Sequence, residues 1–169
     1  LVCTPAVAAD AAAVTAIVAA HESALYRQTT FSQADLEGEW AQLDLGQDAR
    51  VVRDGERIVG YGVVRERGEP WQVEGYVHPD ALGRGIGMLL ATWLEEHAAD
   101  HGARRIHNSV LEADRAARRL LESLGYDAVR VFREMRIELD APPPAPEWPN
   151  GLRVVAFDPD RDARAFHAA

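Results

Sequence analysis

The sequence predicts an α/β (α+β) domain with a mixed, mainly antiparallel sheet flanked by helices. Segments with the two-residue alternation of strands recur between segments whose apolar residues have helical spacing. An Asp-Gly turn at residues 54–55 separates two strand-like runs, as in an antiparallel hairpin. The length of 169 residues, 47% of them apolar, is enough for one such domain with a substantial core.

The predicted element order is β-α-α-β-β-β-α-β-α-β. Residues 1–7 are expected to form a short strand, and an alanine-rich helix is expected at 9–20. A second helix is expected at 32–43, where apolar residues again have helical spacing. Residues 21–31 between them are expected to form a loop or a short helix.

The middle of the sheet is predicted to be antiparallel. The runs 50–53 and 57–65 flank the turn at 54–56, where Asp-Gly tolerates the positive φ angles of a tight hairpin. A further strand at 71–78 ends before Pro79, because proline cannot donate a hydrogen bond to a ladder.

A long amphipathic helix is predicted to start at Ile86. Its apolar residues recur at i, i+3, i+4, i+7 and i+8, and Gly102 stands where a C-terminal cap belongs. A strand is expected at 105–111. Asp114 is the predicted N-cap of a last helix, which Gly125 ends.

The charged residues exclude several functions. The chain has 18 basic and 27 acidic residues, a net charge of −9, and every basic residue is Arg. Without Lys there is no GK[ST] phosphate loop and no Schiff-base nucleophile. Without a basic stripe, no nucleic-acid partner is expected. The acidity favours a cationic small molecule or amine, although solubility alone also explains it.

The cysteine count and the apolar stretches indicate the compartment. Cys3 is the single cysteine, so no internal disulfide can form, and no Cys/His set has zinc-site spacing. No metal is therefore expected. The longest apolar stretch, 11–20, is about half of a membrane span. These observations predict a cytoplasmic protein with no membrane partner.

Three glycines alternate immediately after a strand and at the start of a helix. They are Gly83, Gly85 and Gly87. Free backbone N–H groups and the helix dipole at such a place can bind an anion such as a pyrophosphate. A turn that needs positive φ explains the glycines as well. A dinucleotide-binding Rossmann unit is disfavoured, because the spacing is G-x-G-x-G and an antiparallel hairpin precedes it.

Residues 77–87, Val-His-Pro-Asp-Ala-Leu-Gly-Arg-Gly-Ile-Gly, resemble the acyl-CoA loop of the GNAT N-acetyltransferase superfamily. The helix that ends at Gly125-Tyr126 resembles the next helix of that family, and the resemblance covers residues 1–140. It implies a GNAT fold, acetyl-CoA as co-substrate, and acetyl transfer to a primary amine of a small molecule. The residues that it implies for acetyl-CoA binding are Gly75, Tyr76, Val77, Gly83, Arg84, Gly85, Ile86, Gly87 and Met88.

The same resemblance makes Glu74 and Tyr76 the predicted catalytic residues. Strand alternation places Glu74, Tyr76 and His78 on one face. Glu74 is expected to accept the proton of the amine, directly or through water, and the backbone of Tyr76 or Val77 to donate to the oxyanion. Two alternatives stay open: that Glu74 is only a solvated strand residue, and that the Arg84 side chain is only solvated.

Two positions depart from the family pattern. Leu82 replaces the Arg or Gln at the first loop position, and Leu121 replaces a Tyr of the later helix that can protonate the departing thiolate. These departures favour an alternative function, a catalytically silent acetyl-CoA-binding half that supports an active second GNAT domain. A non-enzymatic interaction domain is a third hypothesis.

The carboxyl-terminal part predicts a domain boundary. A final strand is expected at 129–139, and the proline-rich run at 142–146 is a stiff spacer. The prediction is a GNAT domain at 1–141, a linker at 142–151, and the start of a second GNAT repeat at 152–169.

A closer resemblance supports the second repeat. Residues 131–136, Val-Phe-Arg-Glu-Met-Arg, the spacer, and a strand that restarts at 152–157 together resemble tandem GNAT proteins similar to mycothiol synthase. This resemblance makes the chain the amino-terminal half of such a protein.

Overall fold

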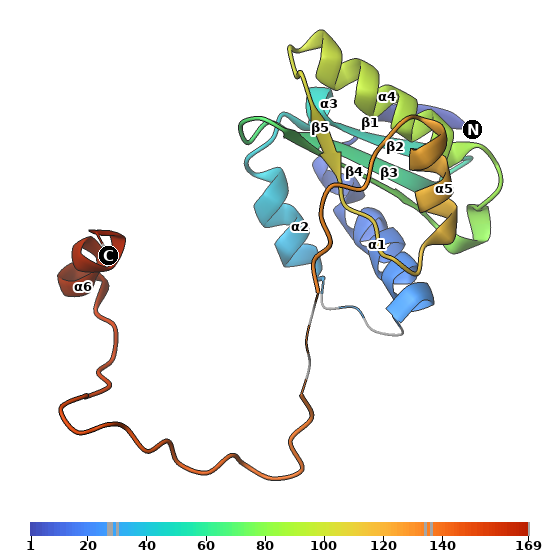
Figure 1. Cartoon of the computed structure of the whole chain (residues 1–169). Helices are drawn as coiled ribbons and strands as arrows, with labels where there is room; N and C mark the ends of the chain where they lie inside the picture. The colour runs from blue at the N-terminus through green and yellow to red at the C-terminus, as the bar shows by residue number, and fades with distance from the viewer. Residues whose placement is uncertain (27–28, 30, 134, 136, 169) are drawn as a thin grey trace. The chain divides into compact units, whose positions relative to one another are not determined.

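A computed structural model describes every residue except 27, 28, 30, 134, 136 and 169. The chain forms two compact units, Leu1–Val129 and Arg130–Ala169. The first unit holds the sheet and the helices that pack on it (Figure 1).

The first unit is built on a five-stranded sheet with the strand order β1-β2-β3-β4-β5. The strands are β1 (Val2–Pro5), β2 (Ala49–Asp54), β3 (Arg57–Arg65), β4 (Trp71–Val77) and β5 (Ile106–Asn108). The first four pair antiparallel, and β5 pairs parallel with β4. The predicted mixed, mainly antiparallel sheet is confirmed.

Helices cover both faces of this sheet. They are η1 (Ala8–Asp10), α1 (Ala11–Tyr26), α2 (Gln33–Trp40), α3 (Leu45–Asp48), η2 (Pro79–Ala81), α4 (Ile86–Asp100) and α5 (Arg115–Ser123). Helices α1 and α2 lie on one face, and α4 lies on the other (Figure 1).

The helix ends follow local capping chemistry, with two differences from the prediction. Helix α1 continues to Tyr26, because residues 21–26 contain no Gly or Pro that would end it; the loop or short helix predicted for 21–31 is wrong over that part. Positions 27, 28 and 30 lie outside the described residues. The unpredicted short helix α3 is capped by the Asp44 carboxylate, which accepts from the Gly46 N–H at 3.0 Å.

The face covered by α1 and α2 buries apolar and aromatic side chains together. Ile17 of α1 and Leu36 of α2 are each 1% exposed, as is Tyr61 of β3. Burying the Tyr61 hydroxyl requires a hydrogen-bond partner, and the indole Nε1 of Trp40 donates to it at 2.8 Å. This bond ties α2 to the middle of the sheet.

The opposite face packs closely against α4 because small residues line it. A Cβ atom added at Gly60 would lie 2.7 Å from Cγ2 of Ile86, and one at Gly62 would lie 3.2 Å from Cδ2 of Leu90. Both glycines therefore allow the helix to approach the sheet. The approach places the first turn of α4 directly beyond the end of β4.

The second unit differs from the prediction. It contains α6 (Pro159–Ala168), and no strand occurs among its described residues. The strand expected at 129–139 is wrong over the described residues of that range, whose alternating side chains stay exposed, with Val131 75% exposed and Met135 93% exposed; positions 134 and 136 lie outside the described residues. The strand expected at 152–157 is absent for the same reason, with Val154 65% exposed. A strand forms only where a ladder partner and a buried face are available.

Within the described part of the chain, no helix is long and apolar enough to span a bilayer.

Substituting Gly60 by Ala is expected to destabilise the fold. The new Cβ would force Ile86 away. Cγ2 of Ile86 has little freedom to move, because it is bonded directly to the Cβ of this β-branched residue. Overpacking of this kind costs about 1–3 kcal/mol, measurable as a lower free energy of unfolding in urea. Gly38→Ala is the control, since no atom lies within 4 Å of the added Cβ in α2, and Ala gains up to about 1 kcal/mol of helix propensity. Equal stability of the two variants would contradict the close approach of α4.

Candidate active site

Strand β4 loses one of its neighbours halfway along its length. Strand β3 pairs with β4 from Gln72 to Val77, whereas β5 pairs with it only from Trp71 to Val73. Beyond Val73, the edge of β4 that faced β5 has no strand partner among the described residues. The sheet therefore opens into a gap beside the carboxyl-terminal half of β4.

The backbone hydrogen bonds show which groups face this gap. The N–H of His78 donates to the Val59 carbonyl in β3, and the N–H of Trp71 donates to the Arg105 carbonyl on the other side. Successive residues of a strand direct their N–H groups to opposite sides, and β4 has a regular register. The N–H groups of Gly75 and Val77 therefore point into the gap, and the N–H of Tyr76 points to β3.

The glycine-rich loop lies at the end of the same strand and begins α4. Gly83 and Gly85 have φ angles of 75° and 80°, which L side chains rarely adopt, and Gly85 is the N-cap of the helix. The first intrahelical hydrogen bond runs from the Leu89 N–H to the Gly85 carbonyl at 3.0 Å. The N–H groups of Ile86, Gly87 and Met88 consequently have no acceptor within the helix. They lie at the end of α4 where the glycine spacing predicts that an anion binds.

The side chains of this loop contribute less than its backbone. Arg84 forms an ion pair with Asp54 of the β2–β3 hairpin at 2.8 Å, and this hydrogen bond lowers the pKa of the Asp54 carboxyl. Leu82 is 55% exposed and carries no charge. The side chain of Ile86 is buried in the core, so only its backbone is available.

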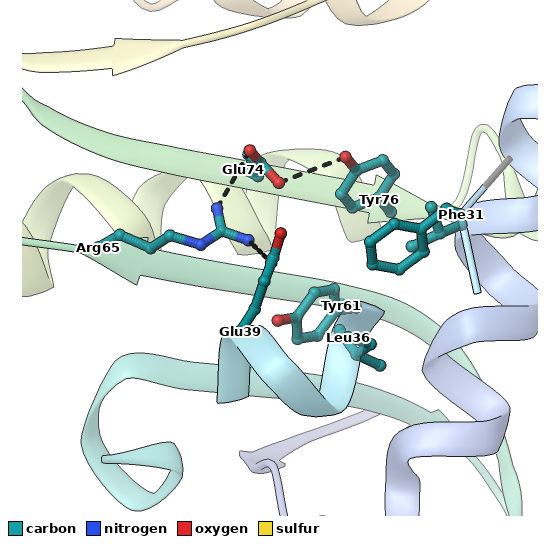
Figure 2. Close-up of a pocket in the computed structure, with 8 residues that line it drawn as sticks. Phe31, Leu36, Glu39, Tyr61, Arg65, Glu74 and Tyr76 are labelled. Carbon is teal, nitrogen blue, oxygen red and sulfur yellow. Dashed lines mark hydrogen bonds and ion pairs between the residues drawn. The ribbon is translucent and has the colours of Figure 1, made fainter. Parts of the chain in front are cut away.

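A cavity of about 190 Å³ lies on the α1 and α2 face of β3 and β4. It is lined by Val18, Phe31, Leu36, Glu39, Tyr61, Arg65, Glu74 and Tyr76 (Figure 2). Apolar and aromatic side chains form most of this wall. One cation and two carboxylates face each other across it.

The charged side chains of the cavity form one network (Figure 2). The Arg65 guanidinium is 8% exposed and contacts Glu39 Oε2 at 2.5 Å and Glu74 Oε1 at 3.1 Å. The Tyr76 hydroxyl donates to the other oxygen of Glu74 at 3.3 Å. Arg65 thus fixes one carboxylate from α2 and one from β4, and the three groups together carry a net negative charge.

The two tyrosines of the cavity stay protonated at neutral pH. Burial raises the pKa of Tyr61 to about 12. Burial, followed by the negative charge of Glu74, raises the pKa of Tyr76 well above its ordinary value. Tyr76 is therefore a hydrogen-bond donor toward Glu74 and not a base.

The structure brings only part of the predicted catalytic face together. Glu74 and Tyr76 are in contact. His78 instead has its ring nitrogens 3.1 Å from Arg57, and its Nδ1 accepts from the Asp80 N–H at 3.2 Å. His78 thus caps η2 after the strand.

Sequence reasoning missed two charged residues of the cavity, Arg65 and Glu39. Arg65 shares its face of β3 with Tyr61 and Val63. A single charged residue at the end of a buried apolar strand was therefore the sequence feature that could have indicated a polar site. Glu39 precedes Trp40 on a short helix, and no pattern distinguishes it from an exposed carboxylate.

No metal centre emerges from the geometry. The described residues contain no group of three or more His, Cys, Asp or Glu side chains placed to hold a metal ion. The gap, the loop and the cavity all adjoin the carboxyl-terminal half of β4. They offer backbone donors at one edge of the strand and a polar, aromatic cavity on its α1 and α2 face.

Comparison with known proteins finds relatives that are similar in sequence and in fold. A mycothiol acetyltransferase from Thermobispora bispora is 37% identical over 119 residues, 70% of this chain and 38% of the relative. The crystal structure of a GCN5-related N-acetyltransferase from Sphaerobacter thermophilus superposes with a TM-score of 0.80 at 34% identity, covering 99% of this chain and 56% of that chain. A GNAT phosphinothricin acetyltransferase from Sinorhizobium meliloti, solved in complex with AcCoA, has a TM-score of 0.61 at 26% identity, covering 73% of each chain.

The chain spans less than half the length of the mycothiol acetyltransferases it matches. The family model described as acetyltransferase (GNAT) family matches residues 16–126. This match covers most of the first unit, including β4, the glycine-rich loop and α5. The chain belongs to the acetyltransferase (GNAT) family of acyltransferases.

Proposed function

We propose that this chain transfers an acetyl group from acetyl-CoA to a primary amine of a small molecule. The observation that carries the proposal is that the glycine-rich loop, the gap and the acidic cavity all adjoin the carboxyl-terminal half of β4. The acetyl-CoA complex of the Sinorhizobium relative supports acetyl-CoA as the co-substrate.

Acetyl-CoA would bind along the gap and the loop. The N–H groups of residues 83–88 would hold the pyrophosphate at the positive end of α4. Gly75, Tyr76 and Val77 would line the pantetheine arm, with the N–H group of Gly75 available to it. Arg84 already pairs with Asp54, so the backbone of the loop would carry most of this binding.

The acetyl carbonyl would lie at the gap, where the Val77 N–H can stabilise the negative charge that develops on its oxygen. Of the two predicted donors, Val77 is the better one because the Tyr76 N–H points to β3. The amine would enter from the cavity on the α1 and α2 face of the sheet. There Glu74 would take its proton, directly or through water, while Tyr76 and Arg65 hold the carboxylate in place.

The proposal of a second domain rests on the length of the matched relatives. The matched relatives are more than twice as long as the matched segment. We therefore keep a GNAT domain at 1–141, a linker at 142–151 and the start of a second GNAT repeat at 152–169, which makes the second domain a partner in the same chain. The free, exposed Cys3 fits a reducing compartment such as the cytoplasm.

The direct test is calorimetric titration of the protein with acetyl-CoA, followed by a panel of amines with detection of free thiol. Binding with thiol release on addition of an amine is the expected result, and it names the acceptor class. Binding without release for every amine would instead indicate a silent coenzyme-binding half. Absence of acetyl-CoA binding would reject both.

Gly85→Ala is expected to weaken acetyl-CoA binding. A Cβ at φ 80° costs about 1–2 kcal/mol. The free loop relieves this strain by leaving the conformation that binds the pyrophosphate, so the dissociation constant should rise about tenfold in calorimetry.

Gly102→Ala is the matched control for that measurement. It introduces the same kind of strain, at φ 94°, beyond the other end of α4. Its dissociation constant should match that of the unmodified chain. A Gly85→Ala protein that binds as tightly as the Gly102→Ala protein would remove the loop from the binding site.

Glu74→Gln is expected to lower kcat by about 100-fold or more, because an amide cannot accept the proton of the amine. Acetyl-CoA affinity, measured by calorimetry, should be retained. Glu39→Gln is the comparison, since it removes the other carboxylate of Arg65 and leaves Glu74 ionisable. Equal losses in the two variants would mean that the ion-pair network, and not the base, accounts for the effect.

A further inference from the structure

A histidine and an aspartate that the proposed mechanism does not use face each other beside the gap. Nε2 of His21, in α1, lies 3.4 Å from Oδ2 of Asp114, and their side chains are 20% and 12% exposed. The other carboxylate oxygen, Oδ1, accepts from the N–H groups of Ala116 and Ala117 at 3.1 and 2.8 Å. The cap fixes Asp114, and its second oxygen is left facing the imidazole.

The position of this pair is set by the elements that meet at the gap. The His21 ring stands edge-on to the Tyr76 ring, with centroids 5.6 Å apart and an interplanar angle of 87°. Tyr76 belongs to the part of β4 that has lost β5. Asp114 lies between the end of β5 and the start of α5. The imidazole is therefore next to Tyr76, in the part of β4 along which the proposed function places the thioester.

The proposed reaction, on which this inference rests, requires a proton donor at that place. Breaking the acyl–sulfur bond leaves a thiolate, and a positioned acid stabilises it as it departs. The Tyr76 phenol is a poor acid, because burial and Glu74 raise its pKa. Glu74 is bound to Arg65 and serves the amine. An imidazole can carry a proton near neutral pH and release it readily.

The charged and titratable groups around His21 fit a proton-donating role. Asp114 faces it from the start of α5, and Tyr76 faces it from β4. Glu22 is the adjacent residue on α1 and accepts from the Thr29 hydroxyl at 2.7 Å. Among the described residues, the group in ion-pair range of the ring is the Asp114 carboxylate, and it forms an ion pair with the imidazole when the ring is protonated.

We infer that His21 is the general acid that protonates the departing CoA thiolate and that Asp114 is its positioning residue. The acceptor ammonium first loses one proton to solvent through Glu74. As the amine attacks, the C–N bond forms and Glu74 takes the second proton. The C–S bond breaks with its electron pair on sulfur, and the imidazolium protonates that sulfur. Glu74 then releases a proton and His21 takes one up, so each turnover yields amide, free thiol and one proton.

The test is the pH dependence of kcat in the 169-residue chain with saturating acetyl-CoA and the amine that the panel identifies. His21→Gln should lose about 100-fold in kcat, the lower end of general-acid contributions. It should also lose the fall of kcat at high pH that deprotonation of the imidazole causes in the unmodified chain. Its KM for acetyl-CoA should change by less than about twofold, because only a transition-state interaction is removed.

Asp114→Asn tests the positioning residue. Asparagine caps helices as well as aspartate, so α5 should keep its start, but the charge facing His21 is removed. kcat should then fall, because the imidazole loses the carboxylate that positions it, while the KM for acetyl-CoA should change by less than about twofold. His107→Gln, at an exposed position of β5, is the control for loss of an imidazole and should keep the original profile.

Each outcome decides between the claims. Unchanged kcat in His21→Gln overturns the inference and leaves the acetyltransferase proposal intact. A lower kcat with an unaltered pH profile in His21→Gln assigns the pair a structural role and also overturns it. An unmodified chain that binds acetyl-CoA and releases no thiol with any amine overturns the proposed function, and the inference with it.

Discussion

The site depends on β4 having two edges of different length. Strand β3 satisfies the backbone of β4 as far as Val77, whereas β5 satisfies it only as far as Val73. A strand that loses one neighbour keeps donors without a backbone acceptor, and unpaired donors are stable only where water or a ligand meets them. The gap, and the Val77 N–H left without a strand partner within it, follow from this difference.

The second constraint is the burial of the Arg65 charge. An isolated buried guanidinium would be strongly unfavourable, so carboxylates must accompany it. Burial alone would lower the pKa of Arg65, but Glu74 and Glu39 outweigh burial and raise it. The network holds α2 against the end of β3 and also presents Glu74 to the cavity. Stability and chemistry thus share the same contacts.

Local patterns predicted the mainly antiparallel sheet, the hairpin, the amphipathic α4 and the glycine-rich loop, because each depends on neighbouring residues. The strand at 129–139 failed because its alternation matches a strand, while pairing needs a partner that alternation cannot reveal. Arg65, Glu39, His21 and Asp114 were not predicted as site residues for a related reason. The Arg65–Glu39 and His21–Asp114 contacts join residues 26 and 93 positions apart, and no spacing in the sequence encodes them.

The outer edges of the sheet are short. Strand β1 has four residues and ends in Pro5, which has no N–H to donate, and β5 has three. Open edges are where strands of separate molecules add to one another and begin to aggregate. A fold that keeps its longest strands, β3 and β4, inside the sheet and ends it with two such short edges offers little template for that process. The unit can therefore expose the backbone of its gap to ligands while limiting self-association at its borders.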